Sequence, residues 1–416
     1  MKRAARNARR SDGDNAYSAD KQALPGNQAM KQRIRRIRAL KLHDESFGNQ
    51  WFDTVLDHWH YDDLSQNPQW RKGWISFDCA LYRPEEDRIY LGITSFDADI
   101  FKVYDRGREA FLDLGYSSVS NRFDGKFHRS LVQGRDGCIY AAVALLHDVD
   151  KYWEAPGSPI IKYDPRSGSI TSLGIPFPHV YIQSLILDTH AETLYGICFP
   201  PEILVSFNLI TGEAQNLGLI GTGIGGMTQG ENIVLDDEGC VWCNWSLTRA
   251  WQNAPGVDAV RFCKYDPRQR RVIFFDQGLP FPDGHYGTVK TESYFNFHDG
   301  YIYASGFNGS LYRVDPQKGT ATFLFTPSPD RPSRLAALVK ASDGVAYGVT
   351  GRDGKCELMR VNYREGTFEK LGDIQDDQGN ALWQCHDILR TTDGRLYVCE
   401  NDNPHRSSYL WEIALE

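Results

Sequence analysis

Two histidines stand where imidazole chemistry could be used. His128 directly precedes an apolar run, and His147 follows 19 residues later in the chain. An imidazole titrates near neutral pH, so it can accept or donate a proton during a reaction. The pair therefore predicts a proton-transfer site, provided that the fold brings both rings to one surface.

Aromatic and cationic side chains at related positions are typical of a surface that binds carbohydrate. Trp and Tyr rings stack on sugar rings, whereas Arg and His bind hydroxyls and carboxylates. A rim that binds protein would use similar side chains, so this alternative stays open. The predicted substrate-binding residues are Tyr181, Trp153, Trp245, Arg249, Arg334 and His386.

The sequence does not identify metal ligands. No HExxH spacing occurs, and Cys240 and Cys243 form an isolated CxxC. On a strand, residues three apart point to opposite faces, so these two thiols are a poor metal pair. The nine cysteines are scattered and odd in number, which favours reduced, buried thiols over a disulfide framework.

A repeated pattern predicts the elements that position these residues. A tight turn followed by an apolar and an aromatic residue recurs seven times, at steps of 44 to 61 residues. A second strand pattern ending in Asp or Asn follows most of these turns. Four strands in each unit of this length describe a propeller blade. The seven turn segments are 87–90, 136–140, 191–195, 238–242, 299–303, 343–347 and 393–397.

The sequence therefore predicts an all-β, seven-bladed β-propeller. The last unit ends before a fourth strand can form, so an N-terminal strand should close the last blade, and segment 52–58 is the best candidate. In a propeller, the starts of the innermost strands and the loops between the second and third strands share one face. His128 and His147 should therefore lie at a common opening.

Charge and hydropathy limit the partners and the domain organisation. The net charge of −8 disfavours nucleic acid as a partner but allows an anionic carbohydrate. No stretch is long enough to span a membrane. Residues 1–45 are predicted to form a disordered, basic extension and 46–416 the propeller. The chain is expected to be monomeric and, lacking a recognisable signal peptide, cytoplasmic; secretion remains an alternative if translation starts elsewhere.

Segment 127–140 (FHRSLVQGRDGCIY), followed by His147, resembles the ulvan lyases of polysaccharide lyase families 24 and 25. Segments 182–188, 194–200 and 385–389 add to the resemblance. It implies a seven-bladed propeller that cleaves uronic-acid-containing poly- or oligosaccharides by β-elimination. It also implies that some members hold a structural zinc, for which this sequence gives no ligand set; a zinc or another divalent cation is therefore an expectation, and no other cofactor is expected.

The resemblance also implies residue roles. His128 and His147 would be the catalytic acid and base, and Tyr195 the tyrosine of the site, with Tyr181 as the alternative. The chain departs from the family at Ser206, where an arginine would neutralise the substrate carboxylate, so Arg249 or Arg334 would have to replace it.

Two other functions are compatible with the sequence. The first is a propeller glycoside hydrolase acting on rhamnose–glucuronate-type linkages. Hydrolysis usually needs paired carboxylates, and Asp148 and Asp150 are the nearest such pair. The second is a non-catalytic propeller that binds a glycan or a protein.

Overall fold

The structure is a computed structural model of the chain. It describes residues 32–47, 61–96, 99–144, 151, 153–199, 201–221, 228–246, 260–284, 287–331 and 333–416. Apart from the N-terminal residues, the chain forms one compact unit, Arg33–Glu416. This unit begins before residue 46, the predicted start of the propeller.

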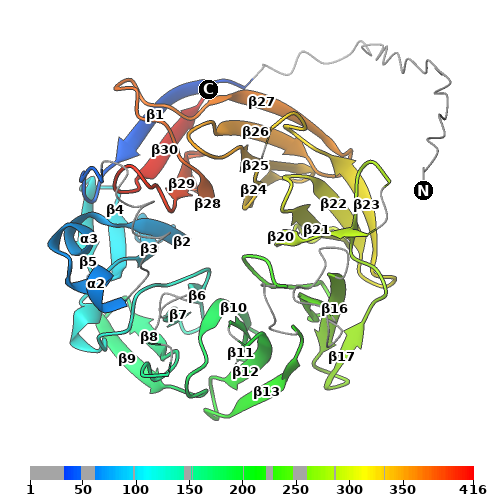
Figure 1. Cartoon of the computed structure of the whole chain (residues 1–416), viewed down its shortest axis with the longest axis horizontal. Coiled ribbons are helices and arrows are strands. Elements are labelled where there is room, and N and C mark those ends of the chain that lie inside the picture. Colours follow the sequence, from blue (N-terminus) through cyan, green and yellow to red (C-terminus); the bar gives the residue numbers. More distant parts are fainter. Residues whose placement is uncertain are drawn as a thin grey trace, which may run out of the picture. The chain divides into compact units, whose positions relative to one another are not determined.

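Seven four-stranded antiparallel sheets form a ring, which confirms the predicted seven-bladed β-propeller (Figure 1). In each of blades 1 to 6 the four strands follow one another in the sequence. Blade 1 contains β2 (Ser76–Arg83), β3 (Arg88–Thr94), β4 (Phe101–Asp105) and β5 (Ala110–Asp113). Blade 2 contains β6 (Val132–Gln133), β7 (Ile139–Ala142), β8 (Ile160–Asp164) and β9 (Ser169–Gly174). Blade 3 contains β10 (Ile182–Asp188), β11 (Thr193–Cys198), β12 (Ile203–Asn208) and β13 (Ala214–Leu219).

The next three blades repeat this order. Blade 4 contains β14 (Val234–Leu235), β15 (Val241–Trp245), β16 (Arg261–Asp266) and β17 (Arg271–Phe274). Blade 5 contains β20 (Thr291–Asn296), β21 (Ile302–Gly306), β22 (Leu311–Asp315) and β23 (Thr320–Phe325). Blade 6 contains β24 (Leu338–Ser342), β25 (Val345–Thr350), β26 (Glu357–Asn362) and β27 (Thr367–Asp373). A short pair, β18 (Leu279–Pro280) and β19 (Thr288–Val289), lies between blades 4 and 5 in the sequence.

The last blade joins the two ends of the compact unit. It combines β28 (Cys385–Arg390), β29 (Leu396–Glu400) and β30 (Leu410–Leu415) with the N-terminal strand β1 (Ile34–Leu40). β1 runs antiparallel to β30 and pairs Ile37 with Ile413. Figure 1 shows this junction of the blue and red strands. An N-terminal strand does close the ring, as predicted.

The predicted identity of that strand was wrong. The outer position is taken by Ile34–Leu40, and segment 52–58 lies outside the described residues. Its apolar residues, Ile34, Ile37 and Leu40, are spaced by three, whereas a strand typically has apolar residues at every second position. A register shift between Ile34 and Arg36 accounts for part of this spacing. The arginines suit an edge strand, because charge there discourages further pairing.

The core lies between the sheets. The second strand of each blade is buried almost throughout, and aromatic residues of these strands pack against a neighbouring blade, as Trp242 does against blade 5 and Tyr303 against blade 6. The fourth strands alternate between partly buried and exposed residues, for example in β9. Gly137 and Gly300 in the predicted tight turns have φ near +80°, a conformation that glycine adopts readily.

Helices are few in the described part of the chain. α2 (Tyr61–Gln66) and α3 (Pro68–Gly73) precede blade 1, and a 3-10 turn (Tyr116–Ser118) follows it. The side chain of Asn67 caps α3 by accepting hydrogen bonds from the backbone N–H groups of Gln69 and Trp70. Within the described residues, no helix has the length and hydropathy needed to cross a membrane.

Candidate functional site

Each blade places one polar residue at or just before the start of its innermost strand. Because these strands surround the axis of the ring, the seven residues come from all parts of the sequence yet lie in one region. Five of them are buried, and Glu231 and Arg334 are partly buried. In blade order they are Asp78, His128, Gln183, Glu231, Glu292, Arg334 and His386.

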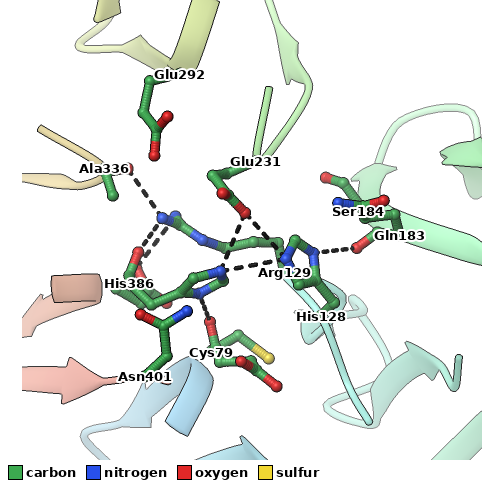
Figure 2. Close-up of polar contacts among 12 residues, drawn as sticks. Cys79, His128, Arg129, Gln183, Ser184, Glu231, Glu292, Ala336, His386 and Asn401 are labelled. Atoms are coloured by element: carbon green, nitrogen blue, oxygen red, sulfur yellow. Dashed lines mark hydrogen bonds and ion pairs between the residues drawn. The ribbon is translucent and has the colours of Figure 1, made fainter. Parts of the chain in front are cut away.

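Three of these side chains, which we call the axial triad, meet at one point. The triad consists of His128, Glu231 and His386. Glu231 Oε2 lies 2.9 Å from His128 Nε2 and 3.1 Å from His386 Nε2. The two Nε2 atoms are 3.2 Å apart. Figure 2 shows the three side chains converging from blades 2, 4 and 7.

The other ring nitrogen of each histidine faces a backbone carbonyl. His128 Nδ1 lies 2.9 Å from the carbonyl oxygen of Gln183, and His386 Nδ1 contacts that of Asp78. A carbonyl oxygen can only accept, so each Nδ1 must carry the hydrogen and donate it. In the neutral imidazole the Nε2 atom then holds a lone pair, and both lone pairs are directed towards Glu231 and the opposite ring.

Burial and charge set the protonation states of the triad. Burial lowers the pKa of His128 and of His386 to about 4, although Glu231 opposes this change. Burial also disfavours a charged Glu231, but Arg334 and the two histidines outweigh it and hold the pKa of that carboxyl well below its usual value. At neutral pH the triad therefore consists of two neutral imidazoles and one carboxylate.

Arg334 holds the carboxylate in place. Its guanidinium donates to Glu231 Oε1, to Glu292 Oε1 and, at 3.5 Å, to Asn401 Oδ1. It therefore occupies the Glu231 oxygen that the histidines do not use. Because protein carboxylates already engage this guanidinium, the structure does not favour Arg334 as the group that receives a substrate carboxylate.

Arg129 extends from blade 2 to residues of blades 6 and 7 next to the triad. Its Nη2 donates to the carbonyl oxygens of Ala336, at 2.9 Å, and of His386, and its Nη1 lies 3.5 Å from Asp387 Oδ1 (Figure 2). Its backbone has φ +43°, the left-handed region that non-glycine residues rarely occupy. Arg129 and Asp387 also line a cavity of about 630 Å³ along the innermost strands, whereas the triad does not.

Lys290 is a cation near the triad whose charge is available to a ligand. Its ammonium group forms no hydrogen bond or ion pair with the residues that the structure describes, and it lies 5.2 Å from the ring centre of Phe307. Partial burial lowers its pKa, while Glu231, Glu292 and Glu202 oppose that shift. The acids therefore reduce the effect of burial on the charge of Lys290, and the side chain is only partly buried.

The structure brings some predicted residues together and separates others. His128, Arg334 and His386 lie at the axis. Tyr195 is buried in β11, where its ring packs against Tyr265 and burial raises its pKa to about 12. It is not part of the axial group.

The remaining predicted residues lie elsewhere or are not described. Tyr181 is buried beside Ala144 and Ala155. Trp153 is 77% exposed and packs on the ring of His179. Trp245 donates its indole N–H to the carbonyl of Phe275 at 3.1 Å. Outside the described residues are His147, Arg249, Asp148 and Asp150.

The sequence analysis missed Glu231, Glu292 and Lys290. One signal could have found the two acids: His386 stands seven residues before Asp393, the acid of its blade's tight turn. Glu292 stands seven before Asp299, and Glu231 seven before Glu238. Aligning the blades on their turns would have placed all three at the axis. Lys290 has no comparable signal.

Comparison with known proteins identifies the fold alone. No protein-family model matches the chain, and no curated protein matches it. Among solved structures, the extracellular domain of BT4673, described as a one-component system, from B. thetaiotaomicron is similar with a TM-score of 0.56 and 13% identity. That match covers 82% of this chain and 38% of the other, so this chain spans well under half the length of that protein.

Two further structures match over nearly their whole length. The WD40 repeats of RRP9 have a TM-score of 0.55 and 11% identity, over 93% of this chain and 99% of theirs. YCF48 from Cyanidioschyzon merolae has a TM-score of 0.51 and 10% identity, over 91% and 98%. At such low identity these likenesses support the propeller architecture and no function.

Proposed function

We propose that this propeller is a carbohydrate-active enzyme that binds uronic-acid-containing poly- or oligosaccharides at the axial triad and cleaves them by β-elimination. One observation carries the proposal. His128, Glu231 and His386 come from three different blades and converge on one polar point, and the two histidines were predicted from the sequence. The resemblance of segment 127–140 to ulvan lyases adds the reaction class.

Recognition of the uronate requires a positive charge beside the triad. Lys290 supplies it, because its ammonium group has no ion-pair partner among the described residues and lies close enough to Glu231 and Glu292 to feel their charge. A uronate carboxylate bound there would be neutralised in a site of low dielectric constant. That neutralisation acidifies the proton on C5 of the sugar.

The elimination then follows from ordinary carbonyl chemistry. A base removes the C5 proton, the electrons of that C–H bond form a C4–C5 double bond, and the C4–O bond breaks. An acid protonates the departing oxygen. No oxidant or reductant is needed, since the sugar acid becomes unsaturated as the glycosidic oxygen leaves with its electrons.

The geometry favours a binding role for His128 over the proton-transfer role predicted from the sequence. Its Nε2 lies 2.9 Å from Glu231 and 3.2 Å from His386 Nε2, so its lone pair is directed into the triad. His147 keeps its predicted role as the proton carrier.

The test measures the unsaturated product. The full-length chain is incubated with a panel of uronate-containing polymers and oligosaccharides, and the near-ultraviolet absorbance of the new double bond is followed. Lys290→Met should lower kcat/KM by about 10²–10³-fold, and Lys290→Arg should restore part of it. His298→Ala is the matched control, because this exposed histidine pairs with Asp237 at a turn between the first and second strands of blade 5. Equal rates for wild type and Lys290→Met, or no unsaturated product from any uronate, would contradict the proposal.

The second candidate is a propeller that binds anionic glycans without cleaving them. The observation in its favour is that Arg334 is fully engaged by protein groups, and that Ser206 stands where the ulvan lyases have an arginine. Retention of uronate oligosaccharides by wild type, lost in Lys290→Met and without product in either, would identify this function.

A further inference from the structure

We propose that His128, Glu231 and His386 bind one divalent transition-metal ion through His128 Nε2, His386 Nε2 and Glu231 Oε2. These three ligand atoms come from three blades, and all lie within 4.8 Å of one another. The site itself rests on geometry alone and does not depend on the proposed lyase activity.

The hydrogen-bond pattern of the triad directs three possible ligand atoms towards one point. Both Nδ1 atoms donate to carbonyl oxygens, so the two Nε2 atoms have no hydrogen when the rings are neutral. The carboxylate of Glu231 has none either. Three lone pairs therefore face one another at hydrogen-bond distances without a donor between them, an arrangement that is repulsive in a buried site unless a positive ion occupies it.

The distances match the size of a metal ion. Two ligands bound at about 2.1 Å to the same ion lie about 3.0 Å apart in an octahedral arrangement and about 3.4 Å apart in a tetrahedral one. The three sides of the triad measure 2.9, 3.1 and 3.2 Å. Each atom pair is thus already at the separation that neighbouring ligands of one ion adopt.

The surroundings orient the ligands as they do in known metal sites. Metal-binding histidines usually donate their second N–H to a carbonyl or carboxylate, which fixes the ring. The carbonyls of Gln183 and Asp78 do this for His128 and His386. Arg334 binds only Oε1 of Glu231 and so leaves Oε2 available. The positive charge of Arg334 is shared with Glu292, which reduces its repulsion of an ion.

The ligand types indicate the kind of ion. Two imidazoles and one carboxylate suit zinc, iron, manganese, cobalt or nickel, whereas calcium and magnesium prefer oxygen ligands alone. The nearby thiols of Cys79 and Cys385 do not join the triad, because they donate to the carbonyl oxygens of Phe127 and Asp387. The soft ions that require thiolates are therefore disfavoured.

Three protein ligands leave coordination positions open. A purely structural zinc usually has four protein ligands, whereas a site with three keeps room for water or substrate. The resemblance to ulvan lyases implied a structural zinc, and the triad fits an open site better. If the proposed function holds, a uronate carboxylate oxygen is the ligand that would complete the ion's coordination, next to Lys290; this step rests on that proposal.

The experiment measures bound metal directly. The full chain, without a polyhistidine tag, is stripped with a chelator and dialysed against zinc, manganese or cobalt. Metal content is determined by elemental mass spectrometry, and cobalt is also followed by its visible d–d absorption. We expect about one tightly bound ion per chain and a cobalt spectrum typical of nitrogen and oxygen ligands.

Variants assign the ion to the triad. His386→Gln and Glu231→Gln should each weaken binding by at least about 100-fold, while His298→Ala and His190→Ala, both exposed histidines at turns, should bind as wild type does. Arg334→Lys should weaken it by about 10-fold, because only the orientation of Glu231 changes. Circular dichroism verifies that each variant is folded. If both triad variants unfold, the number of metal ions bound per wild-type chain and the cobalt spectrum of the wild type still test whether the site exists.

The outcomes separate this inference from the proposed function. Stoichiometric metal lost only in the triad variants supports the site, whether or not any sugar is cleaved. Less than one tight ion in wild type, or equal binding by wild type and both triad variants, overturns it. In that case a single proton shared by the two imidazoles balances the triad. Unsaturated product from a metal-free chain would leave the lyase proposal standing without the ion.

Discussion

The axial triad and the tight turns of the blades use the same residue types in opposite ways. At the turns, a carboxylate accepts a hydrogen bond from an aromatic side chain a few residues later. Tyr140 donates to Asp136, and Tyr303 to Asp299, both at 2.9 Å. At the axis, the contacts of His386 with Glu231 and His128 join residues 155 and 258 positions apart.

The contacts at the turns and the contacts at the axis differ in what they contribute: the first to stability, the second to a binding site. A contact that recurs in blade after blade and is complete within its own turn stabilises the repeat. A position that every blade has, but that the blades fill with several different polar residues, does not stabilise the repeat itself. The axis holds histidine in blades 2 and 7, glutamate in blades 4 and 5 and arginine in blade 6, which is the pattern expected of a binding site built on a symmetric fold.

The largest effect should come from Arg334→Met. The change leaves the buried carboxylate of Glu292 and the partly buried carboxylate of Glu231 without their shared cation, which typically costs about 3–5 kcal/mol in the free energy of unfolding. Arg364→Met is the matched control, since this half-exposed arginine pairs with Asp343 on the surface and should contribute less than about 1 kcal/mol. Urea unfolding monitors both. Equal losses of unfolding free energy in the two variants would show that the arginine at the axis contributes no more to stability than the arginine on the surface.

A smaller loss is expected for Asp236→Ala at the turn of blade 4. The buried carboxylate accepts from the backbone N–H of Cys240 at 2.8 Å and from the indole N–H of Trp242 at 2.9 Å. Its removal should destabilise the protein by about 2–3 kcal/mol. Cobalt binding should stay unchanged, because the turn lies outside the axial site; a loss of cobalt binding by a folded variant would show that turn and axis are coupled.

Tyr303→Phe should have a smaller effect still. It deletes one hydroxyl that donates to Asp299, worth about 0.5–1.5 kcal/mol. Tyr140→Phe removes the equivalent bond in blade 2, with the same length, so the two losses should agree closely. Thermal or urea unfolding measures them. Very different losses would argue that the turn contact is not a repeated stabilising unit.

The smallest effect concerns pH. Glu202 Oε1 accepts from the backbone N–H groups of Thr228 and Gln229, but Oε2 is buried and has no hydrogen-bond partner among the described residues. Burial raises the pKa of this carboxyl. The folded state therefore binds its proton more tightly than the unfolded state, so stability is lost as pH rises through the folded pKa.

Glu202→Gln removes this titration and keeps the acceptor. The variant should gain stability relative to wild type as pH rises from about 4 to about 8, as measured by urea unfolding at several pH values. Parallel curves for the two proteins would show that folding does not change the pKa of Glu202.

The fold could be predicted well from the sequence because each repeat contains the residues that determine its own hairpin. An Asp-Gly turn before an apolar and an aromatic residue determines a hairpin locally, and seven such units at blade spacing determine the ring. The closing strand was misassigned because Ile34, Ile37 and Leu40 do not alternate. A strand with a register shift loses the two-residue period on which such predictions depend.

The candidate site was predicted only in part. His128, Arg334 and His386 were found because histidine and arginine at a strand start are conspicuous. Glu231 and Glu292 were not, since acidic residues are usually exposed and their burial depends on Arg334, more than 40 positions away in the sequence. Pairings of this kind are set by ring closure and leave no local pattern.

The pairing of β1 with β30 also orders events during synthesis. Ile34–Leu40 leaves the ribosome long before its partner, Leu410–Leu415, has been made. Until then the strand has an open edge, and its three arginines discourage pairing with another chain. Closing the long loop between Leu40 and Leu410 is slow, so each new molecule passes a period as an open arc, and a nascent chain stopped before Leu410 cannot close the ring.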